Sequence, residues 1–281
     1  MKHVRVFRRW AGLSPRRRLL LGALALVVAA AGIFTGVKAS QGLPIPVAGR
    51  PGAVILVPGY GGSTTSLDVL AQRIRRTGKT ATVVQLAGNG TGDLNVQAGV
   101  LNGYVNAAIN AGSGPVTLIG YSAGGVVVWL WDVRYGGASR ARMIITLGSP
   151  LHGAELAAVG SAFDPAECPV ACQQLTPGSS LLAELGASPA ADRPPWLSLW
   201  TEDDQTVRPP DSARLPRAVN VPLQSICPTA VISHTQLPTA SLVDGIVLRT
   251  LAAGRVAPPA KADCASLEAL GASNALGGRR T

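Results

Sequence analysis

The sequence predicts an α/β fold in which a mostly parallel sheet of about six strands carries helices on both faces. Over residues 53–255, short apolar runs alternate with stretches of helical spacing. Strands that are apolar along their whole length are typical of a parallel sheet that is buried on both faces. The roughly 230 residues after position 52 are enough to bury one core of this kind.

The expected elements follow one another in regular alternation. The expected strands are continuous apolar runs at residues 53–57, 81–86, 116–119, 143–147, 196–200 and 218–223. The expected helices have apolar residues at helical spacing and span 67–76, 94–111, 126–134 and 242–251. Because parallel neighbours need a long crossover between them, this order of elements supports a parallel sheet.

The N-terminal segment, residues 1–39, holds much of the positive charge of the chain. The whole chain has 25 Lys and Arg against 15 Asp and Glu, a formal net charge of +10, and this segment contains eight of the basic residues and no acidic one. Without those eight, 17 basic residues face 15 acidic ones, a net charge of +2. No basic stripe with interleaved aromatic residues is left, so we expect no nucleic-acid partner.

The same segment has the pattern of an export signal. Arg16, Arg17 and Arg18 precede nineteen uncharged residues, 19–37, and small side chains allow cleavage after Ala39. Nineteen residues can also span a bilayer, so an uncleaved anchor on the outer face of the cytoplasmic membrane is the alternative. Either arrangement places residues 40–281 outside the cytoplasm, and we expect a secreted, extracellular protein.

The remainder divides into a linker, one domain and a tail. Residues 40–52 are rich in Pro and Gly and have little to bury, which is typical of a linker. Residues 53–255 form the α/β domain. Residues 256–281 are rich in Ala, Gly and Pro, and we expect a loosely packed tail that is tethered if Cys264 forms a disulfide.

The four cysteines all lie in the expected exported part, at Cys168, Cys172, Cys227 and Cys264. An even number of cysteines in an oxidising compartment predicts two disulfides, for which three pairings exist. Proximity in the chain favours Cys168 with Cys172 and Cys227 with Cys264. Zinc binding is the alternative, although no histidine neighbours these cysteines at ligand spacing.

A serine directly after the third expected strand is the strongest sign of chemistry. Residues 120–125, GYSAGG, contain a G-x-S-x-G pattern between the strand VTLI and a helix. A sharp turn from strand to helix exposes the Oγ of Ser122 above the start of the helix, where developing negative charge is favoured. The alternative is an ordinary Gly/Ser turn. We predict that Ser122 is a nucleophile.

A nucleophilic serine needs a base, and the chain has only three histidines. His3 lies in the export segment, and His152 follows the fourth expected strand. His234 lies after the last expected strand and before the closing helix, where a loop can reach the serine. We therefore predict that His234 is the base and that His152 is structural or lines a pocket.

Three carboxylates compete to orient the imidazole of His234. Glu202, Asp203 and Asp204 follow the strand WLSLW and lie between the serine and the histidine in the chain. We favour Asp204, which is farthest from the strand and precedes the point where the chain turns back over the site. Asp203 is the second choice, and Glu202 is expected to be a solvated charge.

A tetrahedral intermediate also needs backbone N–H donors for its oxyanion, each worth about 3–4 kcal/mol of barrier. One expected donor is the amide of Ala123, which follows the serine. The other is the amide of Tyr60 in the glycine-rich loop after the first strand. An ordinary glycine turn is the alternative for that loop.

These motifs together resemble a known family. They are PGYGG (58–62), GYSAGG (120–125), TLGSPLHG (146–153), LWTEDDQTV (199–207) and the loop of His234. The sequence resembles, over about residues 53–253, the small secreted bacterial lipases and esterases of the α/β-hydrolase superfamily, near the minimal-lipase and actinobacterial lipase groups. The resemblance implies an α/β-hydrolase fold and hydrolysis of carboxylic esters, commonly acylglycerols, without a cofactor.

The resemblance also implies roles for individual residues: Ser122 as nucleophile, Asp204 as acid, His234 as base, and Tyr60 and Ala123 as oxyanion donors. The chain departs from many relatives at Pro58, where they have His. It departs also at Tyr121-Ser122-Ala123, where they have His-Ser-Met or His-Ser-Gln. Backbone amides still supply the oxyanion hole, whereas these departures leave the acyl-chain preference open.

We therefore expect a secreted serine ester hydrolase, either a triacylglycerol lipase or a carboxylesterase, that forms an acyl-enzyme intermediate. A cell-envelope acyltransferase or thioesterase with the same triad is the alternative, and a non-catalytic binding module is a third. We expect no metal, a monomer, and contact with membrane only through the N-terminal segment or a lipid interface. Residues 150–195 are either a lid over a short, Ala-lined pocket or an ordinary connection.

Overall fold

The computed structural model describes residues 52–157, 168–189 and 193–276. The expected export segment, 1–39, and all of the expected linker except its last residue lie outside these described ranges. Within these ranges, no helix is both long enough and apolar enough to cross a membrane.

A six-stranded sheet forms the centre of the domain, and all of its neighbouring strands are parallel. The strands are β1 (Val54–Val57), β2 (Ala81–Val83), β3 (Val116–Tyr121), β4 (Ala141–Leu147), β5 (Trp196–Trp200) and β6 (Val219–Pro222). Their order across the sheet is β2-β1-β3-β4-β5-β6. The chain runs outward to β2 on one side of β1 and to β3 on the other, so β1 and β3 flank a switch point of the topology, where open α/β sheets bind ligands.

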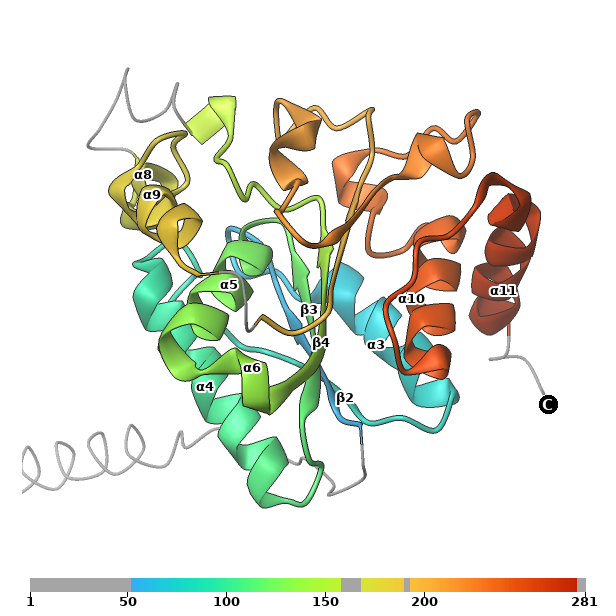
Figure 1. Cartoon of the computed structure of the whole chain (residues 1–281), viewed down its shortest axis with the longest axis horizontal. Coiled ribbons are helices and arrows are strands. Elements are labelled where there is room, and N and C mark those ends of the chain that lie inside the picture. The colour runs from blue at the N-terminus through green and yellow to red at the C-terminus, as the bar shows by residue number, and fades with distance from the viewer. Residues whose placement is uncertain (1–51, 158–167, 190–192, 277–281) are drawn as a thin grey trace, which may run out of the picture. The chain divides into compact units, whose positions relative to one another are not determined.

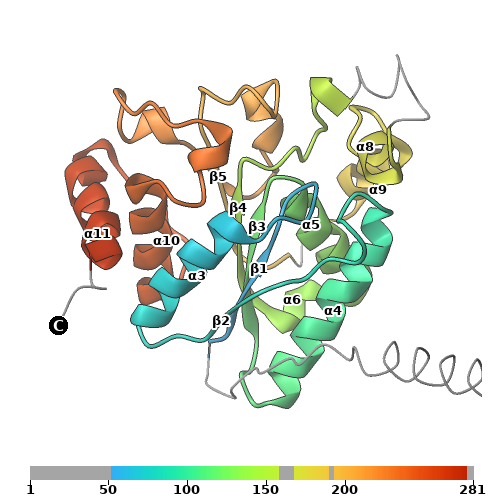
Figure 2. The same cartoon turned by 180° about the vertical axis from the view of Figure 1, so that it is seen from behind.

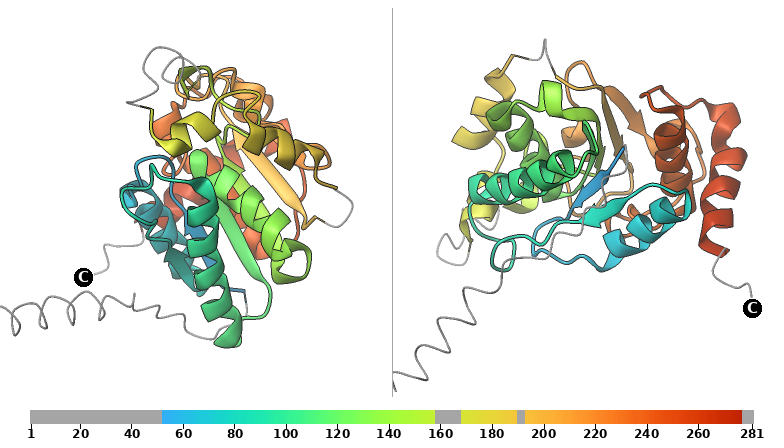
Figure 3. Two further views of the ribbon diagram at one scale, coloured as in Figure 1. Left: turned by 90° about the vertical axis from the view of Figure 1, so that its left-hand side faces the viewer. Right: turned by 90° about the horizontal axis from the view of Figure 1, so that it is seen from below.

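Helices cover both faces of this sheet, as the sequence predicts (Figures 1, 2 and 3). One face carries α3 (Thr65–Arg76), α10 (Ser241–Ala253) and, outside α10, α11 (Cys264–Leu276). The other carries α4 (Leu94–Asn110), α5 (Ala123–Tyr135) and α6 (Gly137–Arg140). The short helices α8 (Val170–Gln174) and α9 (Ser180–Ala187) lie against α4 and α5, and the segments that follow β4, β5 and β6 gather at the carboxyl edge of the sheet, at the top of Figure 1.

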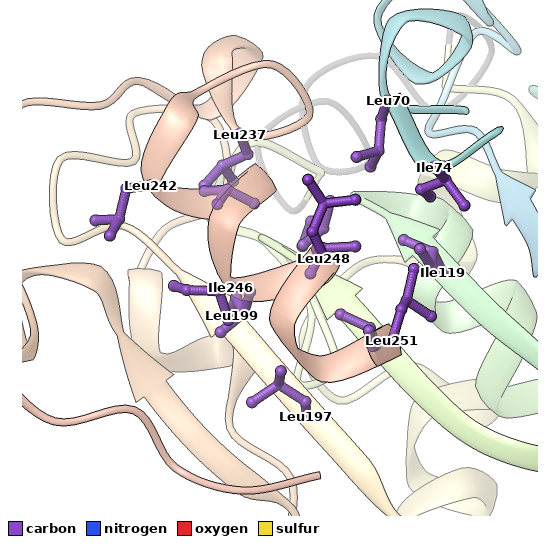
Figure 4. Close-up of a cluster of buried hydrophobic side chains, with 14 of the residues drawn as sticks. Leu70, Ile74, Ile119, Leu197, Leu199, Leu237, Leu242, Ile246, Leu248 and Leu251 are labelled. Atoms are coloured by element: carbon purple, nitrogen blue, oxygen red, sulfur yellow. The ribbon is translucent and has the colours of Figure 1, made fainter. Parts of the chain in front are cut away.

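The core between the sheet and the helices α3 and α10 is made of aliphatic side chains (Figure 4). Ile119 of β3 lies near Ile74 of α3, whereas Leu197 and Leu199 of β5 lie under α10, with Leu199 beside Ile246. Each fully buried side chain of this size contributes about 1.5–3 kcal/mol through loss of its apolar surface from water. This packing fixes the sheet beneath the loops that follow its strands.

The start of α5 differs from the expectation. The sequence predicts a helix over residues 126–134, directly after the GYSAGG pattern, and glycine is a poor helix former. The helix instead begins at Ala123 and contains both glycines. A side chain at Gly124 would collide with the carbonyl oxygens of Val57 and Pro58, so only glycine lets the helix lie this close to β1. Tertiary packing therefore overrides the local propensity.

The structure corrects the expectation that residues 256–281 form a loosely packed tail. Residues 264–276 form α11, which packs along α10, and Leu267 is only 1% exposed. Gly245 of α10 lies against the backbone of Leu267, and Gly271 lies against the carbonyl of Ser241, so the two helices approach without intervening side chains. A disulfide joins Cys227 to Cys264 at the start of α11, as the spacing favoured. The helix therefore belongs to the domain.

Candidate active site

Ser122 occupies the sharp turn between β3 and α5. Its backbone has φ 52° and ψ −130°, and its amide donates to the carbonyl of Leu147 at 2.9 Å. A non-glycine residue held at positive φ costs about 1–3 kcal/mol, which the surrounding packing must offset. The turn presents the Oγ of Ser122 at the carboxyl edge of the sheet, beside the N-terminus of α5.

The imidazole of His234 lies between a hydroxyl and a carboxylate. Its Nε2 is 3.0 Å from the Oγ of Ser122, and its Nδ1 is 2.6 Å from Oδ2 of Asp204. The side chains come from three separate loops, after β3, after β5 and in the 3-10 turn His234–Gln236. His234 is 5% exposed and Asp204 is 1% exposed, so this polar chain lies almost wholly out of water. The structure thus brings together the three residues that the sequence predicts.

The three candidate carboxylates differ sharply in their contacts. Oδ1 of Asp204 accepts hydrogen bonds from the amides of Thr206 at 2.8 Å and Val207 at 2.7 Å, which leaves Oδ2 for the imidazole. Asp203 is exposed and accepts from the side-chain amide of Gln224 at 3.1 Å. Glu202 is also exposed. Of these carboxylates, only that of Asp204 contacts His234.

Tyr121 supports the imidazole, a role that the sequence reasoning did not assign. The ring of Tyr121 lies 5.2 Å from that of His234, centroid to centroid, at an interplanar angle of 32°. Its hydroxyl donates to the main-chain carbonyl of His234 at 3.3 Å. Burial raises the pKa of Tyr121 to about 12, and the negative charge of Asp204 adds to this shift. The phenol therefore stays protonated at neutral pH and remains a hydrogen-bond donor.

Gly148, directly after β4, is the second supporting residue that the sequence reasoning missed. Its φ is +56°, and its amide donates to the carbonyl of Leu199 at 2.8 Å. A Cβ at this position would lie 3.2 Å from Nδ1 of His234 and 3.3 Å from Oδ2 of Asp204. The absence of a side chain at Gly148 therefore leaves room for the imidazole of His234 and the carboxylate of Asp204. The only signal in the sequence is a glycine directly after a strand.

The two expected oxyanion donors lie beside Ser122. Tyr60, Ser122 and Ala123 all line one cavity, and Gly59 approaches so closely that a Cβ there would be 2.9 Å from Cβ of Ser122. The amides of Tyr60 and Ala123 donate to no protein acceptor among the described residues. Ala123 is the first residue of α5, where the helix dipole presents positive charge. Both amides are therefore available to a ligand atom.

The cavity beside Ser122 is small and apolar. Its volume is about 210 Å³, and the remaining lining residues are Pro150, Ala154, Leu156, Ala157, Cys172, Leu175, Thr206 and Val207. Ala154 and Ala157 are among these residues, which agrees with the expectation of an apolar pocket with alanine in its lining. The segment that was expected either to cover the pocket or to connect strands supplies several of its walls, although residues 158–167 and 190–192 within it lie outside the described ranges.

His152 lies apart from this arrangement. It is exposed, its Nδ1 is 3.1 Å from the carbonyl of Ser212, and it lines a different pocket of about 680 Å³ that Ser122 does not line. Its position therefore agrees with the expected pocket-lining role.

The cysteines are all paired. A disulfide joins Cys168 to Cys172, and the second joins Cys227 to Cys264. Glu268 lies close to the latter pair, and these three residues are the one grouping of possible metal ligands within the described ranges. A sulfur bonded in a disulfide offers no thiolate to a metal, so these residues do not form the alternative zinc site.

Comparison with known proteins gives a likeness in structure only. No protein-family model and no curated protein sequence matches the chain. The mature form of the lipase BlEst2 from Bacillus licheniformis has a TM-score of 0.60 at 16% identity, over 74% of this chain and 93% of that protein. Lipase B from Aspergillus fumigatus has a TM-score of 0.60 at 16% identity, over 84% of this chain and 64% of that protein. The chain has the α/β-hydrolase fold.

In an α/β-hydrolase, a serine at the turn from strand to helix is followed in the chain by an acid and then by a histidine. Ser122, Asp204 and His234 occur in this order, and each follows a different strand of the sheet. Tyr60 lies on the loop after β1 and Ala123 at the start of α5, so both lie at the same edge of the sheet as these three side chains.

Proposed function

We propose that the protein is a serine hydrolase of carboxylic esters. The observation that carries this proposal is the continuous chain from Oγ of Ser122 through the imidazole of His234 to the carboxylate of Asp204, with contacts of 3.0 and 2.6 Å. A serine hydroxyl becomes a nucleophile when a base within hydrogen-bond reach accepts its proton. The lipases of similar structure support an ester as substrate.

In the first half of the reaction, Oγ of Ser122 attacks the ester carbonyl carbon while Nε2 of His234 accepts the hydroxyl proton. Asp204 stabilises the imidazolium that forms and holds the ring through Nδ1–H. The negative charge moves to the former carbonyl oxygen, where the amides of Tyr60 and Ala123 donate to it. When the tetrahedral intermediate collapses, His234 returns the proton to the leaving alcohol, and the acyl group remains on Ser122.

In the second half, water attacks the acyl-enzyme. His234 accepts a proton from the water, the oxyanion again receives the two amides, and collapse releases the carboxylic acid as Ser122 regains its proton. Every proton transfer in this scheme runs through His234, and water is the second substrate. We further propose that the domain works outside the cytoplasm, as its two disulfides suggest.

Hydrolysis of p-nitrophenyl butyrate by the purified protein and by matched variants tests the proposal. We expect Ser122→Ala and Asp204→Asn to lower kcat by a factor on the order of 10³ or more, because each removes one of the three hydrogen-bonded side chains. Asp203→Asn is the matched control, since it changes a neighbouring carboxylate that faces Gln224. Equal kcat values for Asp204→Asn and Asp203→Asn would contradict the assignment of the acid, and an active Ser122→Ala would contradict the whole proposal.

A further inference from the structure

The small cavity beside Ser122 lies on the acyl side of the expected reaction. The leaving alcohol must come near Nε2 of His234 to receive its proton, so the alcohol lies on the histidine side of the serine. The cavity is lined by Ser122, Tyr60 and Ala123, whereas His234 is not part of its lining. A group that fills this cavity is therefore attached to the carbonyl carbon, which makes it the acyl chain.

The walls of the cavity are held by backbone contacts. The amide of Ala154 donates to the carbonyl of Leu175 at 3.0 Å, and the amide of Glu155 donates to that of Arg208 at 2.9 Å. Cys172 of helix α8 lines the cavity, and its disulfide with Cys168 ties the helix to the segment just before it. These contacts join three segments that are distant in the chain and limit how far the cavity can widen.

Helix α8 is in turn fixed to the start of α4. The side-chain oxygen of Gln174 accepts from the amide of Leu94 at 2.8 Å, its side-chain nitrogen donates to Asp93 at 2.7 Å, and the amide of Ala171 donates to the carbonyl of Thr91 at 3.1 Å. Leu175, which ends the helix, is 6% exposed. The part of the wall that Cys172 and Leu175 supply therefore belongs to the packed domain.

We propose that this cavity selects short acyl chains, so that the substrates are esters of acids with up to about six carbons. The proposal rests on the ester hydrolase function proposed above. If a methylene takes roughly the space of a water molecule, about 30 Å³, a cavity of about 210 Å³ holds roughly seven such groups, which is the number of carbon and oxygen atoms in an acyl group of six carbons. Pockets for larger ligands generally measure about 300–1,000 Å³. Tyr60 and Leu156, which are 45% and 64% exposed, are the lining residues most open to solvent among the large hydrophobic ones.

The test is the dependence of kcat/KM on chain length for p-nitrophenyl esters from acetate to decanoate, below their solubility limits. For the parent protein we expect a maximum at butyrate or hexanoate and a value at least about tenfold lower for decanoate. Ala154→Leu fills the cavity, and we expect it to lower hexanoate hydrolysis by about tenfold while acetate hydrolysis changes less than threefold. Leu175→Ala enlarges the cavity, and we expect it to move the maximum toward octanoate.

Ala252→Leu, which makes the same change on an exposed part of α10, is the matched control and should reproduce the parent profile. Decanoate hydrolysed as well as hexanoate by the parent, or an Ala154→Leu variant that keeps the parent profile, would overturn the short-chain assignment while the ester hydrolase function stands. If Ala154→Leu does not fold, Leu175→Ala tests the assignment alone: a maximum of kcat/KM that does not move toward longer chains would overturn it. A parent that hydrolyses none of these esters would refute the proposed function, and this inference with it.

Discussion

Replacing Gly148 with alanine tests whether the space at this glycine keeps the imidazole and carboxylate in place. Gly148 has φ +56°, and a Cβ there would lie 2.5 Å from Cδ1 of Leu237, as well as 3.2 Å from Nδ1 of His234 and 3.3 Å from Oδ2 of Asp204. The end of the Leu237 side chain can rotate away. Nδ1 of His234 and Oδ2 of Asp204 are hydrogen-bonded to each other. They cannot both move away from a new Cβ without lengthening this hydrogen bond or shifting the imidazole away from Ser122.

The expected loss of stability has two parts. The left-handed backbone costs an alanine about 1–2 kcal/mol, of which the stiffer unfolded chain returns about 0.4–1. Crowding of the buried neighbours adds about 1–3 kcal/mol. We therefore expect the free energy of unfolding of Gly148→Ala to fall by about 2–4 kcal/mol. Gly254→Ala is the matched control, because Gly254 has φ +64° with open space around its Cβ position, and we expect a loss of only about 1 kcal/mol.

The two variants are compared by urea unfolding and by hydrolysis of p-nitrophenyl butyrate at a temperature where both are folded. Because a displacement of about 1 Å at a reacting group can cost a factor of about 10², the smaller shift expected here should lower kcat of Gly148→Ala by about tenfold or more. Gly254→Ala should keep the parent kcat. Equal kcat and equal stability loss in the two variants would refute the reasoning, since backbone strain alone would then explain both.

Three other changes give distinct outcomes. Burial raises the pKa of Asp132 to about 6 from an ordinary value of 3.8, so the free energy of unfolding falls as pH rises from about 4 to 6 and the buried carboxyl ionises. Asp132→Asn should remove roughly 1–3 kcal/mol of this fall, which urea unfolding at several pH values measures as a shallower dependence on pH. Removing the Cys227–Cys264 disulfide by paired Cys→Ser changes should cost about 2–4 kcal/mol in thermal unfolding, and more than removing Cys168–Cys172, which closes a shorter loop; the reverse ranking would contradict the loop argument. Tyr121→Phe loses the hydrogen bond to the carbonyl of His234, and we expect kcat to fall by up to about tenfold with KM unchanged; an unchanged kcat would show that the hydroxyl does not position the ring.

The sheet and the meeting of Ser122, Asp204 and His234 could be predicted because apolar runs and short motifs in the sequence indicate them locally. A parallel sheet places the ends of all its strands at one edge, so a serine, a carboxylate and a histidine that follow different strands can converge there. The G-x-S-x-G pattern adds the turn that exposes Ser122. With only three histidines in the chain, the position of His234 after the last strand was enough to select it over His152.

The supporting contacts could not be predicted in this way, because they depend on pairs of residues that are distant in the chain. Tyr121 and His234 are 113 positions apart, and nothing in the sequence near Tyr121 specifies a ring against the imidazole. The packing of α11 has the same origin. Its Ala-rich composition suits either a helix or a loose tail, and the close fit of Gly245 against the backbone of Leu267 is a property of the assembled domain.

The choice of Asp204 over Asp203 shows what distinguishes two adjacent carboxylates. The amides of Thr206 and Val207 both bind Oδ1 of Asp204, which is the Asx-turn geometry of an aspartate that begins a tight turn. This turn occupies one carboxylate oxygen and aims the other at Nδ1 of His234. The backbone that follows the acid therefore orients its carboxylate independently of the contact with the histidine. Asp203 has no such turn and lies exposed beside Gln224, so its carboxylate is left to the solvent.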